Sequence, residues 1–320
     1  MTPQPVPLKL IVVTPVYNDW SSFRALVKEL QKLSSSNYVS ISGIVAVNDG
    51  SSEPFEKLDT AIPITLLNLN NNMGHQRAIS VGLSYVNDEI TNFDGVIVMD
   101  SDGEDRPEDI AKIIGFAQTD TYSSIVFAKR EKRTEGSSFK LLYKFYKFIF
   151  KALTGQHIDF GNFSFIPKSL LLRVVSIPEL WNHYSGGIIK SKIPYSSIGT
   201  DRGVRYHGTS KMNFQNLILH GLSSISIYMD VVSVRLLMVA FICSFLVILG
   251  LLLILYLAWF TTLPIPGWSS MTGLLLINIL AIFILTTFLI LLFQLNQKAT
   301  VKFPPKTFYK DFILSIRYLK

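Results

Sequence analysis

The sequence has almost no cysteine and lacks two glycine-rich motifs that commonly bind nucleotides. Cys243 is the only cysteine among the 320 residues, which excludes a disulfide within the chain and a cysteine-based zinc site. No G-x-G-x-x-G segment follows the first strand-like run, so a dinucleotide-binding Rossmann site is disfavoured. No G-x-x-x-x-G-K-[S/T] segment occurs either, which excludes a P-loop.

Charge is missing from a long stretch near the C-terminus. Residues 236–297 contain no Asp, Glu, Lys or Arg, and the whole chain is 49% hydrophobic but only 17% charged. A membrane-spanning helix needs about 20 apolar residues. The stretch therefore predicts two transmembrane helices, Leu236–Phe260 and Met271–Phe293, joined by the proline-containing turn Thr261–Ser270. A buried hairpin in a soluble protein is the alternative, and the length of the two uncharged runs argues against it.

The positive charges that flank these helices predict their orientation. The turn between the helices carries no positive charge, Arg235 precedes the first helix, and basic residues follow the second. The positive-inside rule places both termini in the cytoplasm and the turn outside. We expect no cleavable signal peptide, because residues 1–7 are polar and proline-rich. The net charge of +7 then favours anionic lipid or a phosphorylated lipid over nucleic acid as the partner.

Strand and helix patterns alternate in residues 1–212, which predicts an α/β domain with a mostly parallel sheet. The expected strands are Leu8–Thr14, Ile44–Val47, Ile64–Leu69, Val96–Met99 and Ser124–Ala128. Residues 139–153 mix lysines with aromatic residues. They form either a helix on the membrane surface or a core helix whose lysine side chains extend to the solvent. Residues 213–230 are predicted as an amphipathic interfacial helix, and residues 298–320 as a basic C-terminal tail.

Two aspartates come directly after an apolar, β-branched run. Asp100 and Asp102 follow the expected strand Val96–Met99, at the strand end where open α/β sheets bind ligands. Hard divalent cations prefer oxygen ligands and usually share them with substrate phosphates. The pattern therefore predicts a metal–diphosphate site, with a solvated acidic turn as the alternative. Other polar groups follow the neighbouring strands and are expected on the same rim: Tyr17, Asn18, Asp49 and Arg130.

The chain at this point resembles a known family. Thr14–Asn18, Val47–Ser51 and Asp100–Asp102 are similar to segments of family 2 glycosyltransferases with the GT-A fold. Asp102–Glu108 resembles the D-L-Q-x-P-P-E segment of dolichyl-phosphate mannose synthases and bacterial polyprenyl-phosphate glycosyltransferases. Val204–Met212 is similar to their R-x-x-G-x-S-K segment. The resemblance covers nearly the whole chain, because the interfacial helix and the membrane hairpin also follow in the same order.

The resemblance implies a role for each matched residue. The metal, Mg²⁺ or Mn²⁺, would be held by Asp100, Asp102 and Glu104. Phosphate contacts would come from Arg130, Arg205 and Lys211, of which Arg205 and Lys211 would act in catalysis with the two aspartates. Contacts to the donor would come from Pro15, Tyr17, Asn18, Asp49 and Gln76.

The chain departs from the family pattern at three positions. Asn18 stands where the family often has Glu, and Glu104 stands where it usually has Gln. Asn162 stands where bacterial members have the Asp of G-D-F, so Asp159, three residues earlier, is a candidate base. His183 and His207 are further candidates for carrying a proton.

The implied reaction is an inverting, metal-dependent transfer of a sugar from a nucleoside diphosphate sugar to a polyprenyl phosphate, undecaprenyl or dolichyl. Two alternatives stay open: a processive polysaccharide synthase, although its Q-x-x-R-W motif is missing, and a membrane scaffold that binds sugar nucleotides without catalysis. A homo-oligomer is also left open.

Overall fold

The structure is a computed structural model that describes residues 8–34, 39–55, 58–130, 147–156, 160–208, 221–262 and 267–319. The chain divides into two compact units. The sheet unit holds the described parts of residues 8–130, 160–227 and 302–319. The hairpin unit holds residues 147–156 and the described parts of 228–301.

The sheet unit is built on one mixed sheet of eight strands, in the order β7-β5-β6-β4-β1-β2-β3-β8. Neighbours pair in parallel at β1–β2, β1–β4, β2–β3 and β5–β7, and in antiparallel fashion at β3–β8, β4–β6 and β5–β6. The strands are β1 (Lys9–Val16), β2 (Ser40–Asn48), β3 (Ile64–Leu69), β4 (Gly95–Val98), β5 (Ile125–Arg130), β6 (Ser164–Pro167), β7 (Tyr195–Thr200) and β8 (Ile313–Leu319).

Helices cover both faces of this sheet, as the alternation of side chains along β1 requires. Ile11 and Val13 point into one core, and Leu10 and Val12 point into the other. The first core also receives apolar side chains from α2 (His75–Glu89), α5 (Lys168–Val175), η1 (Pro178–Trp181) and α6 (Tyr184–Lys190). The second receives them from α1 (Trp20–Ser34) and α3 (Asp109–Thr119). The α/β class expected from the sequence is confirmed.

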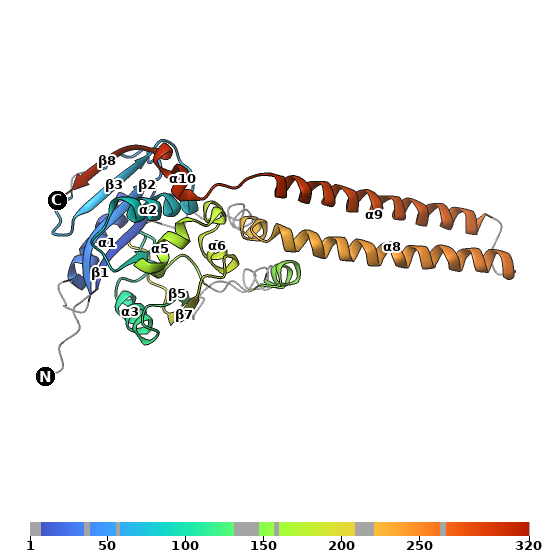
Figure 1. Ribbon diagram of the computed structural model, residues 1–320, viewed down its shortest axis with the longest axis horizontal. Coiled ribbons are helices and arrows are strands. Elements are labelled where there is room, and N and C mark those ends of the chain that lie inside the picture. The colour runs from blue at the N-terminus through green and yellow to red at the C-terminus, as the bar shows by residue number, and fades with distance from the viewer. Residues whose placement is uncertain are drawn as a thin grey trace. The chain divides into compact units, whose positions relative to one another are not determined.

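The sheet is mostly parallel, as the sequence predicted, but its last strand was not expected. Six of the eight strands run in the same direction, and β6 and β8 run against them. The segment expected to be a basic tail passes through α10 (Pro305–Phe308) and η2 (Tyr309–Phe312) and ends in β8, which lies beside β3 at the sheet edge (Figure 1). Asn68 donates to Ser315 across this pair, at 3.0 Å. Such pairing joins residues far apart in the chain and leaves no local sequence signal.

The hairpin unit contains two long apolar helices, α8 (Met229–Phe260) and α9 (Trp268–Ala299). Both are long and apolar enough to cross a membrane, and most of their side chains are exposed rather than packed in a core. This confirms the two expected apolar helices. The first begins earlier than predicted and ends at Phe260 as predicted, and the second extends beyond the predicted bounds at both ends. Residues 263–266 of the turn lie outside the described residues.

The expected interfacial helices are described only in part. Residues 147–153 of the segment 139–153 are helical, and Arg235 of α8 donates to the carbonyl of Ala152 at 2.5 Å, near the end of that helix. Residues 221–226 of the segment 213–230 are also helical, and α8 already begins at Met229. The remaining residues of both segments lie outside the described part of the chain.

Candidate active site

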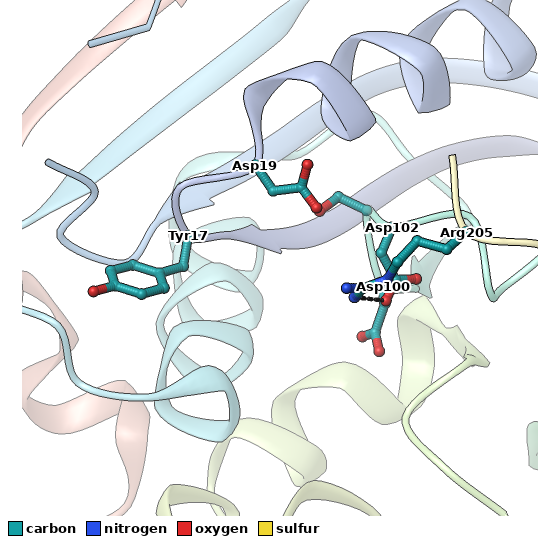
Figure 2. Close-up of a pocket in the computed structure, with 6 residues that line it drawn as sticks. Tyr17, Asp19, Asp100, Asp102 and Arg205 are labelled. Atoms are coloured by element: carbon teal, nitrogen blue, oxygen red, sulfur yellow. Dashed lines mark hydrogen bonds and ion pairs between the residues drawn. The ribbon is translucent and has the colours of Figure 1, made fainter. Parts of the chain in front are cut away.

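A pocket opens in the sheet unit where β1 and β4 end. Figure 2 shows Asp100, Asp102 and Arg205 close together on one side of it, while Tyr17 points away from them on the other. The parallel pairing of β1 with β4 brings the ends of these two strands to the same rim, as the sequence predicted. The residues that line the pocket are Tyr17, Asp19, Asp100, Ser101, Asp102 and Arg205.

The loop after β4, residues 100–106, is held by hydrogen bonds within itself. Asp105 accepts a hydrogen bond from the backbone N–H of Asp100 at 2.9 Å, and Asp102 accepts one from the backbone N–H of Glu104 at 2.9 Å. Gly103 adopts φ +93°, a left-handed conformation that favours glycine. We call residues 100–106 the acidic loop. Its four carboxylates are thereby fixed along one short turn.

Asp100 pairs with a histidine from the start of α2. His75 Nε2 lies 3.1 Å from Asp100 Oδ1. Burial alone would raise the pKa of Asp100, but the positive charges of His75, Arg130 and Arg205 outweigh it and lower that pKa. Burial would likewise lower the pKa of His75, and the neighbouring carboxylates, Asp100 first, raise it. The pair therefore favours the charged form of each side chain.

Asp102 pairs with Arg205, whose Nη2 lies 2.5 Å from Asp102 Oδ2 (Figure 2). Burial raises the pKa of Asp102, the negative charge of Asp100 raises it further, and the bond to Arg205 opposes both. Two carboxylates that destabilise each other's charge are stabilised by a bound cation. The energetic cost of holding Asp100 and Asp102 together is therefore what a divalent cation would relieve.

Two more arginines reach the rest of the acidic loop. Arg130, at the end of β5, lies 3.3 Å from both Glu104 and Asp105. Arg202 lies 2.7 Å from Glu104. Asp105 is buried, and burial together with the charge of Asp100 raises its pKa to about 7. The sequence motifs assigned no role to Arg202, Asp105 or Asp19. Only Asp105 could have been placed at the site from the sequence, because it stands in the same acidic run as Asp100 and Asp102.

A short segment after β7, residues 202–206, lies directly on the acidic loop; we call it the strap. Its backbone N–H groups at Gly203 and Tyr206 donate to the carbonyls of Glu104 and Asp102, at 2.9 and 2.8 Å. A Cβ atom added to Gly203 would lie 2.1 Å from the carbonyl oxygen of Gly103. The strap can therefore approach the loop only with glycine at position 203.

This contact gives a testable prediction. We expect Gly203→Ala to lower turnover about tenfold or more, because the strap must shift and move Arg205 away from Asp102. Gly115→Ala is the matched control, since Gly115 lies in α3 with open space around its added Cβ. The control should keep full turnover and gain about 0.5–1 kcal/mol of stability. Steady-state turnover and thermal unfolding of the two variants check both statements, and equal turnover in the two would contradict the first.

Several residues expected to contact the donor make contacts within the protein. The Asp49 carboxylate accepts from the backbone N–H groups of Met73 and Gly74, at 2.7 and 3.0 Å, and burial raises its pKa. The side-chain oxygen Oδ1 of Asn18 accepts hydrogen bonds from the backbone N–H groups of Ser52 and Glu53, at 2.9 and 3.2 Å. Both residues thus fix loops around the rim.

The other two residues expected near β1 remain close to the pocket. Tyr17 lines the pocket, and 46% of its surface is exposed. Its aromatic ring offers a flat face on which a nucleobase could stack. The Pro15 carbonyl accepts a hydrogen bond from the Ser101 hydroxyl at 3.2 Å, which ties β1 to the acidic loop. Pro15 therefore supports the pocket through its backbone.

Gln76 belongs to a hydrogen-bonded chain that ends at His75. Its Oε1 accepts from the backbone N–H of Tyr184 at 2.6 Å, which fixes the orientation of the amide. Its Nε2 then donates to Asn162 Oδ1 at 3.3 Å, and Asn162 Nδ2 lies 2.9 Å from His75 Nε2. The chain joins α2, α6 and the segment before β6 beside Asp100. Sequence reasoning placed Gln76 at the site but did not single out His75.

Three further candidates, Lys211, Asp159 and His183, have no described contact with the pocket. Lys211 and Asp159 lie outside the described residues. His183 is the N-cap of α6, where its Nδ1 accepts from the backbone N–H of Gly186 at 3.2 Å. That contact gives His183 a structural role.

The acidic loop suits a hard cation only in part. In the described part of the chain, no three His, Cys, Asp or Glu side chains are grouped so that they could hold a metal ion. Asp100 and Asp102 remain as two oxygen donors at the pocket. Mg²⁺ is commonly bound by one or two carboxylates with the remaining positions filled by water and substrate phosphates. The two aspartates fit that pattern, whereas Glu104 is engaged by two arginines.

Comparison with known proteins decides the family. The family described as glycosyl transferase family 2 matches residues 11–181, just over half of the chain. This chain is a family 2 glycosyltransferase. The matched residues begin within β1 and include β2 to β6 and the acidic loop, so the resemblance to family 2 glycosyltransferases is confirmed.

Two relatives of this family 2 glycosyltransferase carry the same general description. The glycosyltransferase YkcC of Bacillus subtilis is 25% identical over 282 residues, 81% of this chain and 80% of the relative. The glycosyltransferase sll0501 of Synechocystis is 23% identical over 230 residues, 69% of this chain and 70% of the relative.

Solved structures give weaker matches. A glucosyl-3-phosphoglycerate synthase from Mycobacterium tuberculosis is 15% identical with a TM-score of 0.47, over 70% of this chain and 80% of that one. A mannosyl-3-phosphoglycerate synthase from Rubrobacter xylanophilus is 15% identical with a TM-score of 0.45, over 69% and 72% of the two chains. The assignment to family 2 rests on the sequence match.

Proposed function

We propose that this family 2 glycosyltransferase moves a sugar from a nucleoside diphosphate sugar to a polyprenyl phosphate at a membrane surface. One observation carries the proposal: Asp100, Asp102 and Arg205 converge on one pocket, and Arg130 and Arg202 pair with Glu104 of the same acidic loop. Carboxylates for a divalent cation and guanidinium groups for phosphate are the two sets of ligands that a metal-bound diphosphate requires. The apolar hairpin α8–α9 adds a route to a lipid acceptor.

Asp100 and Asp102 would hold the metal, Mg²⁺ or Mn²⁺, which when bound supplies positive charge to the departing diphosphate. Arg205 and Arg130 would hold phosphate oxygens through the paired N–H groups of their guanidinium planes. Tyr17 would face the nucleoside. These side chains position the donor and stabilise the charge that develops as the sugar leaves.

A phosphate acceptor explains why the described pocket needs no strong base. The second pKa of a phosphate monoester is about 6, so the acceptor is largely ionised near neutral pH and is already a nucleophile. Asn162, in the position where bacterial relatives of this type have Asp, cannot accept a proton, which is consistent with such an acceptor. Direct displacement by the phosphate oxygen would invert the anomeric centre.

The proposed membrane orientation gives a second prediction. In a Cys243→Ser background, a cysteine placed at Ser269, near the start of α9, should react with an impermeant maleimide in intact cells. A cysteine in place of Lys28, an exposed residue of α1 in the sheet unit, should react only after lysis. The reason is the absence of positive charge between the helices and its abundance after them. Labelling of Ser269→Cys only after lysis would refute the orientation.

The test of the function is a transfer assay on isolated membranes. Membranes that contain the wild-type chain are supplied with a panel of radiolabelled sugar nucleotides and a polyprenyl phosphate. We expect label in the organic-solvent extract for at least one sugar nucleotide, and none for membranes containing Asp102→Asn. Label in a polymer would favour a processive synthase, and no label from any donor would favour a non-catalytic scaffold.

A further inference from the structure

Glu104 holds two arginines at once. Its Oε1 lies 2.7 Å from Arg202 Nη2, and its Oε2 lies 3.3 Å from Arg130 Nη1. The Glu104 side chain is mostly enclosed, with 16% of it exposed, while the side chains of Arg130 and Arg202 are 34% and 31% exposed. A single negative charge is therefore shared by two cations that can still be reached from solvent.

The two arginines come from different parts of the sheet unit. Arg130 ends β5, and Arg202 begins the strap that two backbone hydrogen bonds fix to the acidic loop. The strap also carries Arg205, which pairs with Asp102. Arg202 thus lies in the same short segment as Arg205, which lines the pocket and is assigned to phosphate.

A neighbouring ion pair shows what a surface pair looks like in this chain. Arg106 pairs with Glu108 at 2.6 Å, and the glutamate side chain is 68% exposed. Such a pair contributes little, because water screens it. The Glu104 group differs in being enclosed, in joining three elements and in lying beside Asp102, so the surface-pair interpretation does not extend to it.

We propose that Arg202 is a further phosphate contact of the transfer site, held on Glu104 until a diphosphate replaces the carboxylate. The inference rests on the proposed function. A diphosphate offers several charged oxygens to paired N–H donors, so it can take over both Arg202 and Arg130 from one carboxylate. Binding then includes the cost of breaking the two contacts to Glu104, and removing the charge of Glu104 removes that cost.

The consequence is a gain of affinity on removing an acid. We expect Glu104→Gln to bind inorganic pyrophosphate, with EDTA present, about fivefold or more tightly than the wild-type chain. Arg202→Gln should bind it about fivefold or more weakly than wild type. The double variant Glu104→Gln with Arg202→Gln should lose most of the gain, because the arginine that Glu104 releases is missing. Pyrophosphate is the probe because it tests the phosphate contacts without a base or a sugar.

Glu108→Gln is the matched control. It removes one negative charge four residues further along, at an exposed pair that does not face the pocket. It should change pyrophosphate affinity by less than about twofold. Titration calorimetry on the full-length chain in detergent gives the five affinities, and circular dichroism confirms that each variant is folded.

Three outcomes would overturn the inference: unchanged or weaker binding in Glu104→Gln, an equal gain in Glu108→Gln, or no pyrophosphate binding by the wild-type chain. The transfer assay separates this failure from failure of the proposed function. Transfer to lipid with an unchanged Glu104→Gln affinity rejects only the role of Arg202. Transfer to neither lipid nor polymer rejects the function itself.

Discussion

The Asp102→Asn variant is expected to lose its transfer activity, a rise of more than about 1.4 kcal/mol in the barrier, while it stays folded and bound to membranes. Asp102 lines the pocket and is one of the two carboxylates available for a cation. The amide keeps the size of the side chain and the hydrogen bond from the Glu104 backbone N–H, but it removes the charge. The variant should therefore lose catalytic activity while it keeps its fold.

Initial rates of label transfer, measured at saturating donor and over a range of Mn²⁺ concentrations, check this result. Glu108→Gln serves as the control, because it removes one acid from the adjacent segment without touching the pocket. The control should retain near-normal transfer. Retention of more than about a tenth of the activity by Asp102→Asn would argue against the metal role of this carboxylate.

The Arg205→Ala variant is expected to lose about a hundredfold or more in turnover, with a much smaller change in affinity for the free sugar nucleotide. Arg205 lines the pocket and lies 2.5 Å from Asp102, where the departing diphosphate would gain charge. Its removal also leaves Asp102 beside Asp100 without its cation, a costly arrangement for a partly buried pair. Lys211, outside the described residues, is expected to behave like Arg205 on the grounds of the matched motif.

Turnover and donor affinity of Arg205→Ala and Lys211→Ala in detergent test this expectation. Arg173→Ala on the exposed face of α5 is a control with the same loss of charge. Near-normal turnover in both Arg205→Ala and Lys211→Ala would show that these residues form an ordinary basic surface. Arg205→Lys should recover only part of the turnover, because an ammonium group cannot make the paired contacts of a guanidinium.

The strands and the rim of the site were predictable because their signals are local. A buried parallel strand is a short apolar run, and β1, β3 and β4 each appear so in the sequence. The carboxyl ends of parallel strands meet at one edge, so Asp100 and Tyr17 could be placed on the same rim before any coordinates. The uncharged run that becomes α8 and α9 is a signal of composition alone.

The contacts between distant segments could not be predicted in the same way. The pairing of β8 with β3 joins residues about 250 positions apart, and no side chain of β8 is fully buried, so the strand lacks the apolar run that marks β1, β3 and β4. The hydrogen-bonded chain from Gln76 to His75 likewise depends on how α2, α6 and Asn162 meet. Arg202 has no motif of its own, and only the backbone bonds of the strap bring it to Glu104.

The single measurement closest to the central claim is the fate of radiolabelled sugar in membranes supplied with a sugar nucleotide and a polyprenyl phosphate. The account predicts label that enters the lipid extract, needs Mg²⁺ or Mn²⁺, and is absent when Asp102 is replaced by Asn. Label that appears only in a polymer or a water-soluble product, or lipid labelling that persists in Asp102→Asn membranes, would contradict it.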